Sequence, residues 1–338
     1  MENKIEPTIL AIESSCDETA ASVIKNGVVL SNVVATQSVH EKFGGVVPEI
    51  ASRAHLQNIV PVVQQALAEA KIDKKDLNAI AFTQAPGLLG ALLVGSSFAK
   101  GMAQALDIPL IGVHHMQAHV LAHWIEDPKP SFPFLCLTVS GGHTQIVLVK
   151  SPLEMEILGE TIDDAAGEAF DKIAKMLGLP YPGGPLIDQY AQNGNPSAFK
   201  FPIPNMQELN FSFSGTKTAV LYFLKKQVVE NPNFVEENLE DICASVQFTI
   251  VEALLKKFSK AAKQYHIKQV GVAGGVSANS GLRKALIALG EKQKLEVFLP
   301  KFEYCTDNAA MIAMAAHFKM QEKQFVDLTA IPSARGQF

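Results

Sequence analysis

The sequence predicts an α/β fold of two similar halves, and three observations lead to this prediction. Short apolar runs alternate with longer amphipathic segments along most of the 338 residues, which is typical of strands alternating with helices. Two hairpin-like segments with polar tips, at residues 9–30 and 134–149, resemble each other. A chain of this length also exceeds what a single small core usually supports, so we expect two domains.

The first hairpin has the sequence ILAIESSCDETAASVIKNGVVL. An apolar strand leads into the polar turn ESSCDET, a second strand follows, and Asn26-Gly27 is a strong signal for a tight hairpin turn. In the second hairpin, FLCLTVSGGHTQIVLV, two apolar strands flank the turn SGGHT. We interpret the pair as an internal repeat in which each copy opens a domain.

Between the hairpins the chain alternates helix and strand. Residues 48–70 have apolar side chains at helical spacing, and we expect Pro61 to kink or interrupt this helix. A buried strand is predicted at 77–83 and a helix rich in small residues at 88–106. The strand predicted at 109–115 runs directly into a further helix.

The second half repeats this alternation with longer insertions. We predict a helix at 163–179, loop-like residues at 193–210 and a long amphipathic helix at 242–265. Residues 269–286 then read as a strand, a glycine turn and a helix.

The domain boundary is predicted at residues 126–134, which contain three prolines and show no periodicity. We therefore expect a first domain at 1–127, a second domain at 128–327 and a C-terminal tail at 328–338. Two such halves facing each other would leave a cleft between them.

Composition describes a well-buried globular protein, with 48% hydrophobic and 19% charged residues. The four cysteines are widely spaced and form no CxxC pair, which favours reduced core thiols. No signal peptide is evident in the first residues, and no uninterrupted apolar run is long enough to span a membrane. A soluble cytoplasmic protein without a membrane partner is the expectation.

The net charge of −5 argues against unaided binding to nucleic acid, because neutralising phosphates supplies most of that affinity. Local positive charge exists in residues 256–268 and at Arg283-Lys284. Contact with RNA would therefore need such a local patch or the help of a partner.

Four polar turns follow predicted strands, at residues 13–19, 138–144, 181–185 and 273–279. Open α/β sheets bind ligands at these carboxyl ends of strands. Glycine pairs in such turns let the backbone approach a ligand and expose N–H groups to phosphate oxygens. None of the turns matches a P-loop or a GxGxxG motif. We predict a nucleotide site of another kind, formed by turns from both halves.

Polar residues beside these glycines have two interpretations each. Asp17 and Glu18 could hold a divalent cation or orient a nucleophile, and Asp17 could instead form hydrogen bonds with its own turn. Ser277 and Asn279 could cap the helix that follows or bind a ribose or base.

A second candidate site is the histidine cluster HHMQAH at residues 114–119. His115 and His119 are four residues apart, so on a helix they share one face and could bind one metal. The motif resembles the zinc-peptidase motif HExxH but lacks its glutamate. Asp307 is the candidate third ligand, although Asp307 or Thr306 could merely cap the apolar helix that follows. Two histidines and one carboxylate suit Fe(II), with Zn(II) as the rival.

Ten motifs, in order along the chain, resemble the bacterial TsaD family, the tRNA N6-adenosine threonylcarbamoyltransferases once described as glycoproteases. The resemblance covers about residues 9–318. The turn TVSGG lacks the tyrosine of archaeal and eukaryotic relatives, which agrees with the bacterial branch. HHMQAH differs from the commoner HHMEGH only at positions that are not ligands. The motifs are IESSCDETAASV, GGVVPEIASRAH, QAPGLLGALLVG, HHMQAHVLA, VSGGHTQIV, GEAFDKIAKMLGL, YPGGP, FSFSGTKTAV, AGGVSANSGLR and CTDNAAMIA.

The resemblance implies an actin-like ATPase (ASKHA) fold, with two RNase H-like lobes around a central cleft. It also implies a reaction, the transfer of a threonylcarbamoyl group from threonylcarbamoyl-AMP to the N6 amine of an adenosine in tRNA. That adenosine lies immediately 3′ of the anticodon, in tRNAs that read codons beginning with A. The rival functions are a small-molecule kinase of the same fold, a metallopeptidase and a non-enzymatic nucleotide-binding scaffold.

The same resemblance implies roles for individual residues. The metal ligands would be His115, His119 and Asp307, holding one divalent ion per subunit. The chemistry of the reaction adds one role that the resemblance does not supply: the adenine amine is a weak nucleophile, and Asp17 is our candidate for removing its proton during attack. The adenine nucleotide, threonylcarbamoyl-AMP or ATP, would contact Thr138, Val139, Ser140, Gly141, Gly142, Asp171, Gly184, Asp188 and Asn279.

The resemblance also implies partners. The family acts on tRNA together with TsaB, a catalytically degenerate paralogue, and the ATPase TsaE, while a TsaC-type synthase supplies threonylcarbamoyl-AMP. We expect TsaB to contact the small-residue helices within residues 48–106.

Overall fold

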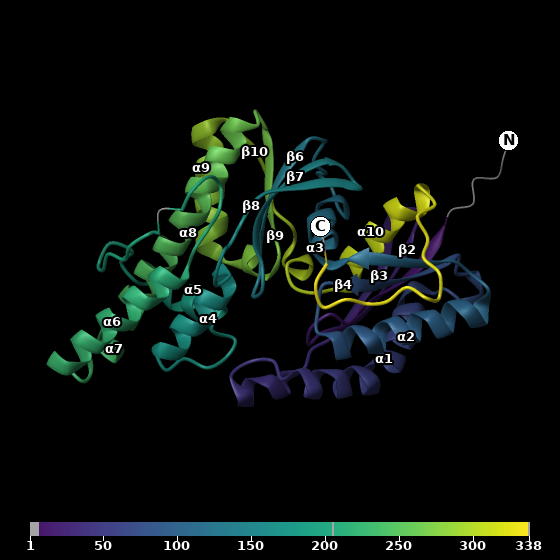
Figure 1. Ribbon diagram of the computed structural model, residues 1–338, viewed down its shortest axis with the longest axis horizontal. Helices are drawn as coiled ribbons and strands as arrows, with labels where there is room; N and C mark the ends of the chain where they lie inside the picture. The colour runs from purple at the N-terminus through teal and green to yellow at the C-terminus, as the bar shows by residue number, and fades with distance from the viewer. Residues whose placement is uncertain (1–6, 205, 337–338) are drawn as a thin grey trace. The chain divides into compact units, whose positions relative to one another are not determined.

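The computed structural model describes residues 7–204 and 206–336, which form two compact units (Figure 1). Unit 1 consists of Met1–Pro130, Ser151–Met155 and Pro300–Phe338. Unit 2 consists of Ser131–Lys150 and Glu156–Leu299. The proline-rich segment predicted as the boundary contains the first crossing between the units.

Unit 1 is built on a five-stranded sheet in the order β3-β2-β1-β4-β5. The first three strands pair antiparallel, and β4 and β5 continue the sheet parallel to β1. Asn26 and Gly27 both have positive φ, as a tight turn of this kind requires, and they connect β2 to β3. The strands are β1 (Thr8–Glu13), β2 (Thr19–Lys25), β3 (Val28–Ala35), β4 (Ala79–Ala85) and β5 (Leu110–His114).

Helices cover both faces of this sheet (Figure 1). α1 packs on β2 and β3 and α2 packs on β4, while α10 packs on the first three strands from the other side. The α-helices of unit 1 are α1 (Pro48–Ala70), α2 (Leu89–Leu106), α3 (His115–Leu121) and α10 (Ala309–Gln321). Short 3₁₀ helices are η1 (Ser38–Phe43), η2 (Lys74–Asp76), η3 (Ala122–Trp124) and η5 (Phe302–Tyr304).

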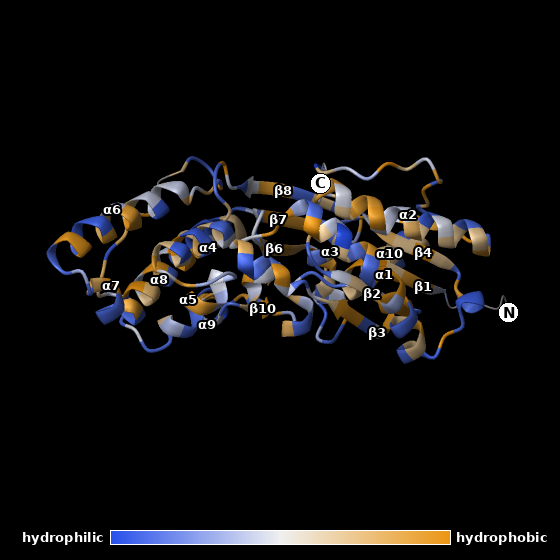
Figure 2. Ribbon diagram, turned by 90° about the horizontal axis from the view of Figure 1, so that it is seen from below, coloured by the Kyte–Doolittle hydropathy of each residue, from blue (hydrophilic) through white to orange (hydrophobic). Residues whose placement is uncertain are grey.

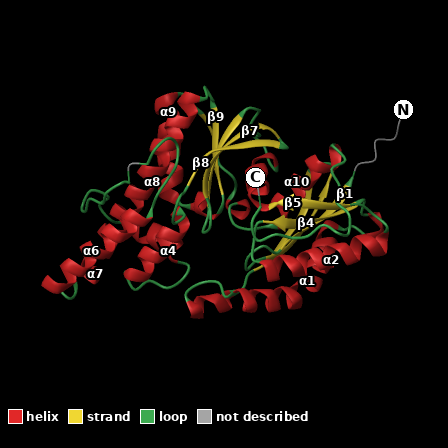
Figure 3. Ribbon diagram, viewed as in Figure 1, coloured by secondary structure: helices red, strands yellow, loops and turns green. Residues whose placement is uncertain are grey.

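Unit 2 contains a second five-stranded sheet, in the order β10-β9-β6-β7-β8 (Figure 3). Relative to the first strand of each unit, this order equals that of unit 1, which confirms the internal repeat. The strands are β6 (Phe134–Val139), β7 (Thr144–Ser151), β8 (Glu154–Glu160), β9 (Gln269–Ala273) and β10 (Glu296–Phe298). The helices are α4 (Ala166–Met176), α5 (Gly183–Ala191), α6 (Ser214–Glu230), α7 (Phe234–Glu237), α8 (Leu239–Gln264), η4 (Gly275–Ala278) and α9 (Ser280–Gln293).

Hydrophobic residues concentrate on the strands, whereas most helices alternate between hydrophobic and hydrophilic residues (Figure 2). Each unit has its own core, centred on side chains such as Ile12 and Phe82 in unit 1 and Phe170 and Phe258 in unit 2. The described part of the chain has no disulfide. It also has no helix that is both long enough and apolar enough to cross a bilayer.

The structure differs from the predicted domain boundaries on the C-terminal side. Residues 300–327, expected in the domain at 128–327, belong to unit 1, because α10 packs on its sheet. Of the segment predicted as a tail at 328–338, the described residues 328–336 continue along the same unit, where Ser333 N–H donates to the Gln84 carbonyl at 2.9 Å.

Pro61 does not interrupt α1, contrary to one of the two expected outcomes. The helix is continuous from Pro48 to Ala70. Proline removes one helical hydrogen bond, from its own nitrogen to the carbonyl four residues earlier. Both Pro61 and Gln57 are exposed, so water can satisfy that carbonyl.

Small residues let α2 lie very close to the turn between β1 and β2. The Ser14 hydroxyl donates to the Ala91 carbonyl at 3.0 Å, and Leu88 N–H donates to the Ser15 carbonyl at 2.7 Å. A Cβ added at Gly95 would overlap Ser14 Oγ. The spacing between the helix and this turn therefore depends on the glycine.

Gly95→Ala should lower the free energy of unfolding by about 1–3 kcal/mol, because the new methyl group forces α2 away from Ser14. Gly101→Ala in the same helix is the control, since a Cβ at Gly101 meets no atom within 4 Å. That variant should gain about 0.5–1 kcal/mol from the better helix propensity of alanine. Urea unfolding measures both, and equal stabilities of the two variants would contradict this packing argument.

Candidate active site

The three predicted metal ligands lie together in unit 1. Nitrogen atoms of His115 and His119 and an oxygen of Asp307 all lie within 4.8 Å of one another. His115 Nε2 is 3.4 Å and His119 Nε2 is 3.1 Å from Asp307 Oδ1. The two imidazole rings meet edge to face, with centroids 4.7 Å apart. This group could hold a metal ion.

Local structure explains how α3 presents its two histidines. His114 is the last residue of β5, and its ring nitrogen accepts a hydrogen bond from Gln117 N–H at 3.4 Å, which caps α3. The helix therefore begins at His115, and one turn later His119 lies on the same face.

Asp307 reaches this face because α10 packs against α3. Asn308 caps α10, since its side-chain oxygen accepts from Met311 N–H at 3.0 Å. The alternative in which Asp307 or Thr306 caps this helix is therefore wrong. Asp307 is left to face the two imidazoles instead.

Glu13 is a functional candidate that the sequence analysis missed. This last residue of β1 is fully buried, and its Oε2 lies 3.0 Å from His115 Nδ1 and 2.7 Å from the Thr83 hydroxyl, which donates to it. Its other oxygen accepts from Ser15 N–H. The available signal was an acidic residue at the end of an otherwise apolar strand, TILAIE.

The charges of this group are interdependent. Burial raises the pKa of Asp307 and Glu13, but His115, together with His119 at Asp307 and Ser15 at Glu13, lowers both pKa values overall. Burial likewise lowers the pKa of His115, whereas Asp307 and Glu13 raise it well above its usual value. Burial lowers the pKa of His119, which stays neutral. A proton on His115 therefore offsets part of the negative charge of Glu13 and Asp307.

The turn that carries Asp17 borders this group. Helix α1 supports the turn through His55, whose Nδ1 lies 2.8 Å from the Thr19 hydroxyl and whose Nε2 lies 3.0 Å from the Cys16 carbonyl. Burial raises the pKa of Glu18 to about 10, with further contributions from Asp307 and Asp17. Glu18 is therefore protonated at neutral pH, and Asp17 beside it is half-buried.

The predicted nucleotide-binding residues form a second group, in unit 2. Thr138 and Val139 end β6 and are buried, and the turn that follows exposes Gly141 and Gly142. A Cβ at either glycine would meet no atom within 4 Å. There is therefore open space above the turn, and the fold itself does not require glycine at these two positions.

Gly274 contrasts with this pair. Its φ is +85°, and an added Cβ would lie 2.5 Å from the Val139 carbonyl oxygen. The close approach of the β9 turn to the β6 turn thus explains this glycine without a ligand.

Hydrogen bonds from helix α4 hold two of the glycine turns of unit 2, and Gly274 brings the third against the end of β6. Gly167 N–H, in the first turn of α4, donates to the Ser140 carbonyl at 3.2 Å. Asp171 Oδ1 accepts from Gly183 N–H at 2.9 Å and from Gly184 N–H at 3.0 Å. The structure therefore brings three of the four predicted turns together in unit 2, while the turn at 13–19 belongs to unit 1.

Asp188 and Asn279 both act at the start of α9. Asp188 accepts from Ser280 N–H at 2.9 Å and from the Ser280 hydroxyl at 2.7 Å. Asn279 caps the helix by accepting from Leu282 N–H at 2.8 Å, and its amide donates to Gln247 at 2.6 Å. Of the two interpretations of Asn279, the helix cap is the one observed here.

Comparison with known proteins identifies the family. The model of the family TsaD, tRNA N6-adenosine threonylcarbamoyltransferase, matches residues 28–314. The curated protein of that name from Christiangramia forsetii is 63% identical over 333 residues, covering 98% of each chain. The one from Thermosipho africanus is 51% identical and covers 97% of this chain and 99% of its own. The chain belongs to this family.

Solved structures show the fold of this TsaD family member. Full-length HypF, in its phosphate- and nucleotide-bound form, has a TM-score of 0.65 at 14% identity, over 98% of this chain and 48% of that one. Component A of (R)-2-hydroxyglutaryl-CoA dehydratase from Acidaminococcus fermentans has a TM-score of 0.54 at 15% identity, and the match covers 93% of this chain and 99% of that one. The actin-like ATPase fold expected from the sequence is confirmed.

Membership of the TsaD family implies a divalent metal and an adenine-nucleotide ligand. The residues fit a metal on three counts: two imidazoles and a carboxylate are its usual donors, a buried carboxylate orients one imidazole, and Asp307 is 22% exposed. The exposed side leaves room for further ligands at the metal.

Glu13→Gln should weaken binding of a divalent metal about 10- to 100-fold, because His115 loses the carboxylate that fixes its ring and tautomer. Competition between the protein and a chromophoric chelator for Zn(II) or Co(II) measures this affinity directly. Glu69→Gln, an exposed change of the same charge on α1, is the control and should bind like the wild type. Wild-type affinity in the Glu13 variant would show that the contact does not orient His115.

Proposed function

We propose that the protein transfers the threonylcarbamoyl group of threonylcarbamoyl-AMP to the N6 amine of the adenosine 3′-adjacent to the anticodon. Its substrates are the tRNAs that read codons beginning with A. The observation that carries this conclusion is nearly full-length identity of 51–63% to threonylcarbamoyltransferases, in a chain whose His-His-Asp group is intact.

The donor is a mixed carbamic–phosphoric anhydride and is already activated, so no covalent nucleophile is needed. Cys16, in the turn at the site, agrees with this. Burial, followed by the neighbouring acids, raises the pKa of its thiol far above the usual value. A thiol in that state is a poor nucleophile.

In this proposal His115, His119 and Asp307 hold one divalent ion, Fe(II) as the first choice and Zn(II) as the alternative. The bound ion would supply polarisation of the threonylcarbamoyl carbonyl. Glu13 keeps His115 oriented from behind. Asp17 takes a proton from the adenine amine as it attacks, while protonated Glu18 can donate a hydrogen bond nearby.

The adenylate part of the donor is proposed to bind the turns of unit 2. The open space above Gly141 and Gly142 supports contact between their backbone amides and the phosphate, where they would stabilise the AMP leaving group. The Oδ2 atom of Asp171 has no hydrogen-bond partner within the described residues, so it is available for a ribose hydroxyl. Thr138, Val139, Ser140, Gly184, Asp188 and Asn279 would complete this pocket.

Neither of the two enzymatic rivals, the metallopeptidase and the small-molecule kinase, gains support from the site. Met116, Gln117 and Ala118 between the two histidines supply no general base for peptide hydrolysis, and Glu13 contacts His115 at Nδ1, away from Asp307. A small-molecule kinase has no use for the histidine pair.

A contact with TsaB on α1 and α2 is supported by exposed apolar side chains at helical spacing. Leu56 and Val60 on α1 are 65% and 48% exposed, and Leu89 and Leu93 on α2 are 50% and 46% exposed. The two helices pack against each other, so this surface suits a helical partner. TsaE and a TsaC-type synthase are the other proposed partners. Separate elution of purified TsaB and this protein on size exclusion would count against the contact.

Reconstitution tests the reaction. The protein, TsaB, TsaE, threonylcarbamoyl-AMP and an unmodified tRNA should yield threonylcarbamoyladenosine, detected by mass spectrometry after digestion. His115→Ala and His119→Ala should lose the product and the bound metal together. Product from both variants would assign the histidines to packing, and no product from the wild type would reject the transferase.

The same assay tests the unit 2 turn. The free energy of unfolding of Gly142→Ala should lie within about 0.5 kcal/mol of the wild-type value, because the added Cβ enters open space. The methyl group would occupy the space proposed for the phosphate, so KM for threonylcarbamoyl-AMP should rise about 10-fold or more. An unchanged KM would place the adenylate elsewhere.

A further inference from the structure

The second half of unit 2 carries an uneven distribution of charge that the proposed chemistry does not use. Residues 253–294 contain nine lysines and arginines and a single acidic residue, Glu291, in a chain whose net charge is −5. Five exposed lysines form what we call the lysine face: Lys256, Lys260 and Lys263 on α8, and Lys292 and Lys294 at the end of α9.

The geometry of α8 and α9 brings these charges to one surface. Residues 256, 260 and 263 are spaced by four and three, so their side chains leave the same side of α8. Gln293, between the other two lysines, donates to the Ser259 hydroxyl at 2.6 Å. The end of α9 therefore lies beside the lysines of α8, and Figure 1 shows the two helices side by side.

The exposed Glu252 lies one turn before Lys256 on α8 but forms no ion pair with the lysine face in the described structure. Within the described residues, none of the five lysines takes part in an ion pair, whereas Lys150, Lys172 and Lys301 each pair with a glutamate. Burial lowers the pKa of neighbouring Lys257, and Lys260 and Lys256 lower it further. A positive potential thus persists around α8, at the cost of repulsion between Lys256 and Lys260.

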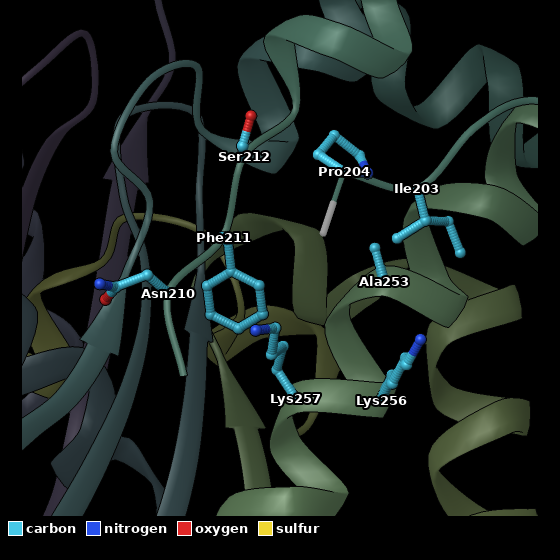
Figure 4. Close-up of a pocket in the computed structure, with 8 residues that line it drawn as sticks. All are labelled: Ile203, Pro204, Asn210, Phe211, Ser212, Ala253, Lys256 and Lys257. Carbon is cyan, nitrogen blue, oxygen red and sulfur yellow. The ribbon is translucent and has the colours of Figure 1, made fainter. Parts of the chain in front are cut away.

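A cavity of about 190 Å³ borders one end of the lysine face (Figure 4). Lys257 donates to the Met206 and Glu208 carbonyls at 2.6 and 2.8 Å, which fixes the segment that forms the opposite wall. The cavity can accommodate several groups of the size of water, each of which takes about 30 Å³. Its lining is Ile203, Pro204, Asn210, Phe211, Ser212, Ala253, Lys256 and Lys257.

We propose that the lysine face binds the phosphate backbone of the tRNA substrate, with Lys256 directing one phosphate to the adjacent cavity. This proposal rests on the proposed function and adds the surface that holds the acceptor. Lysines spaced along about 10 Å of helix suit the regular charges of a nucleic-acid backbone. The exposed side chains from Lys256 to Lys263 include no apolar residue, which disfavours a protein-binding hot spot.

The physical role of the face follows from counterion release. Phosphate contacts by lysine position the RNA without reading its sequence, and each contact adds to the salt dependence of binding. A protein with net charge −5 can then bind tRNA through one region of local positive charge. The surface would contribute to KM for tRNA and leave the chemical step unchanged.

The test compares two triple variants in the complete reconstituted mixture. Lys256→Gln, Lys260→Gln and Lys263→Gln remove three charges from the face. Lys200→Gln, Lys225→Gln and Lys226→Gln are the matched control, because these lysines of unit 2 lie outside the lysine face and are also exposed and without an ion pair in the described structure. Anisotropy of a labelled unmodified tRNA gives Kd over a series of KCl concentrations, and product formation gives KM and kcat.

For the lysine-face variant we expect Kd and KM for tRNA to rise about 10-fold or more near 0.1 M salt, with kcat unchanged. The slope of log affinity against log salt should fall by about 2, since each lost contact removes about 0.7–0.9. The control should match the wild type. If circular dichroism shows that the lysine-face variant is folded and its Kd and salt slope equal those of the wild type, the proposal is overturned.

Two other outcomes are distinguishable. If the variant loses comigration with a partner protein while its tRNA Kd is unchanged, the face binds that acidic protein surface and the proposal is wrong. If the wild type itself neither binds tRNA nor forms product, the proposed function has failed, and that result is separate from any difference between the two triple variants.

Discussion

The candidate site depends on one buried contact, between Glu13 at the end of β1 and His115 at the start of α3. A carboxylate with no exposed surface is stable only when donors surround it, and Glu13 has three: the Ser15 amide, the Thr83 hydroxyl and His115. The contact ties the central strand of the sheet to the helix that carries both histidines. This contact therefore orients the His115 ring so that its other nitrogen faces Asp307.

The close packing of unit 1 around the β1–β2 turn also holds residues of the candidate site in position. Helix α2 approaches the turn because Gly95 leaves room for Ser14, and His55 of α1 holds the far side of the turn through Thr19 and Cys16. The acidic groups of this turn are thus held in place before any ligand binds. Such preorganisation is what a site needs if it is to stabilise charge during a reaction.

The two units show how one topology supports two kinds of site. Both sheets have the same strand order, and both place a turn after the first strand. In unit 1 that turn is acidic and lies beside imidazoles, which suits a cation. In unit 2 it exposes Gly141 and Gly142 with open space above them, which suits an anion such as a phosphate. The difference lies in the residues of each turn and, in unit 1, in the histidines that α3 places beside it.

The sequence by itself determined the features that depend on neighbours along the chain. Alternation of strands and helices, the turn at Asn26-Gly27, the i, i+4 pair His115 and His119, and the order of the family motifs are all local. Only the tertiary structure decided the rest. Asp307 meets His119 across 188 residues because α10 packs on unit 1, and Asn308 rather than Asp307 caps that helix. Glu13 gained its partner His115 from packing between distant elements, which no local pattern records.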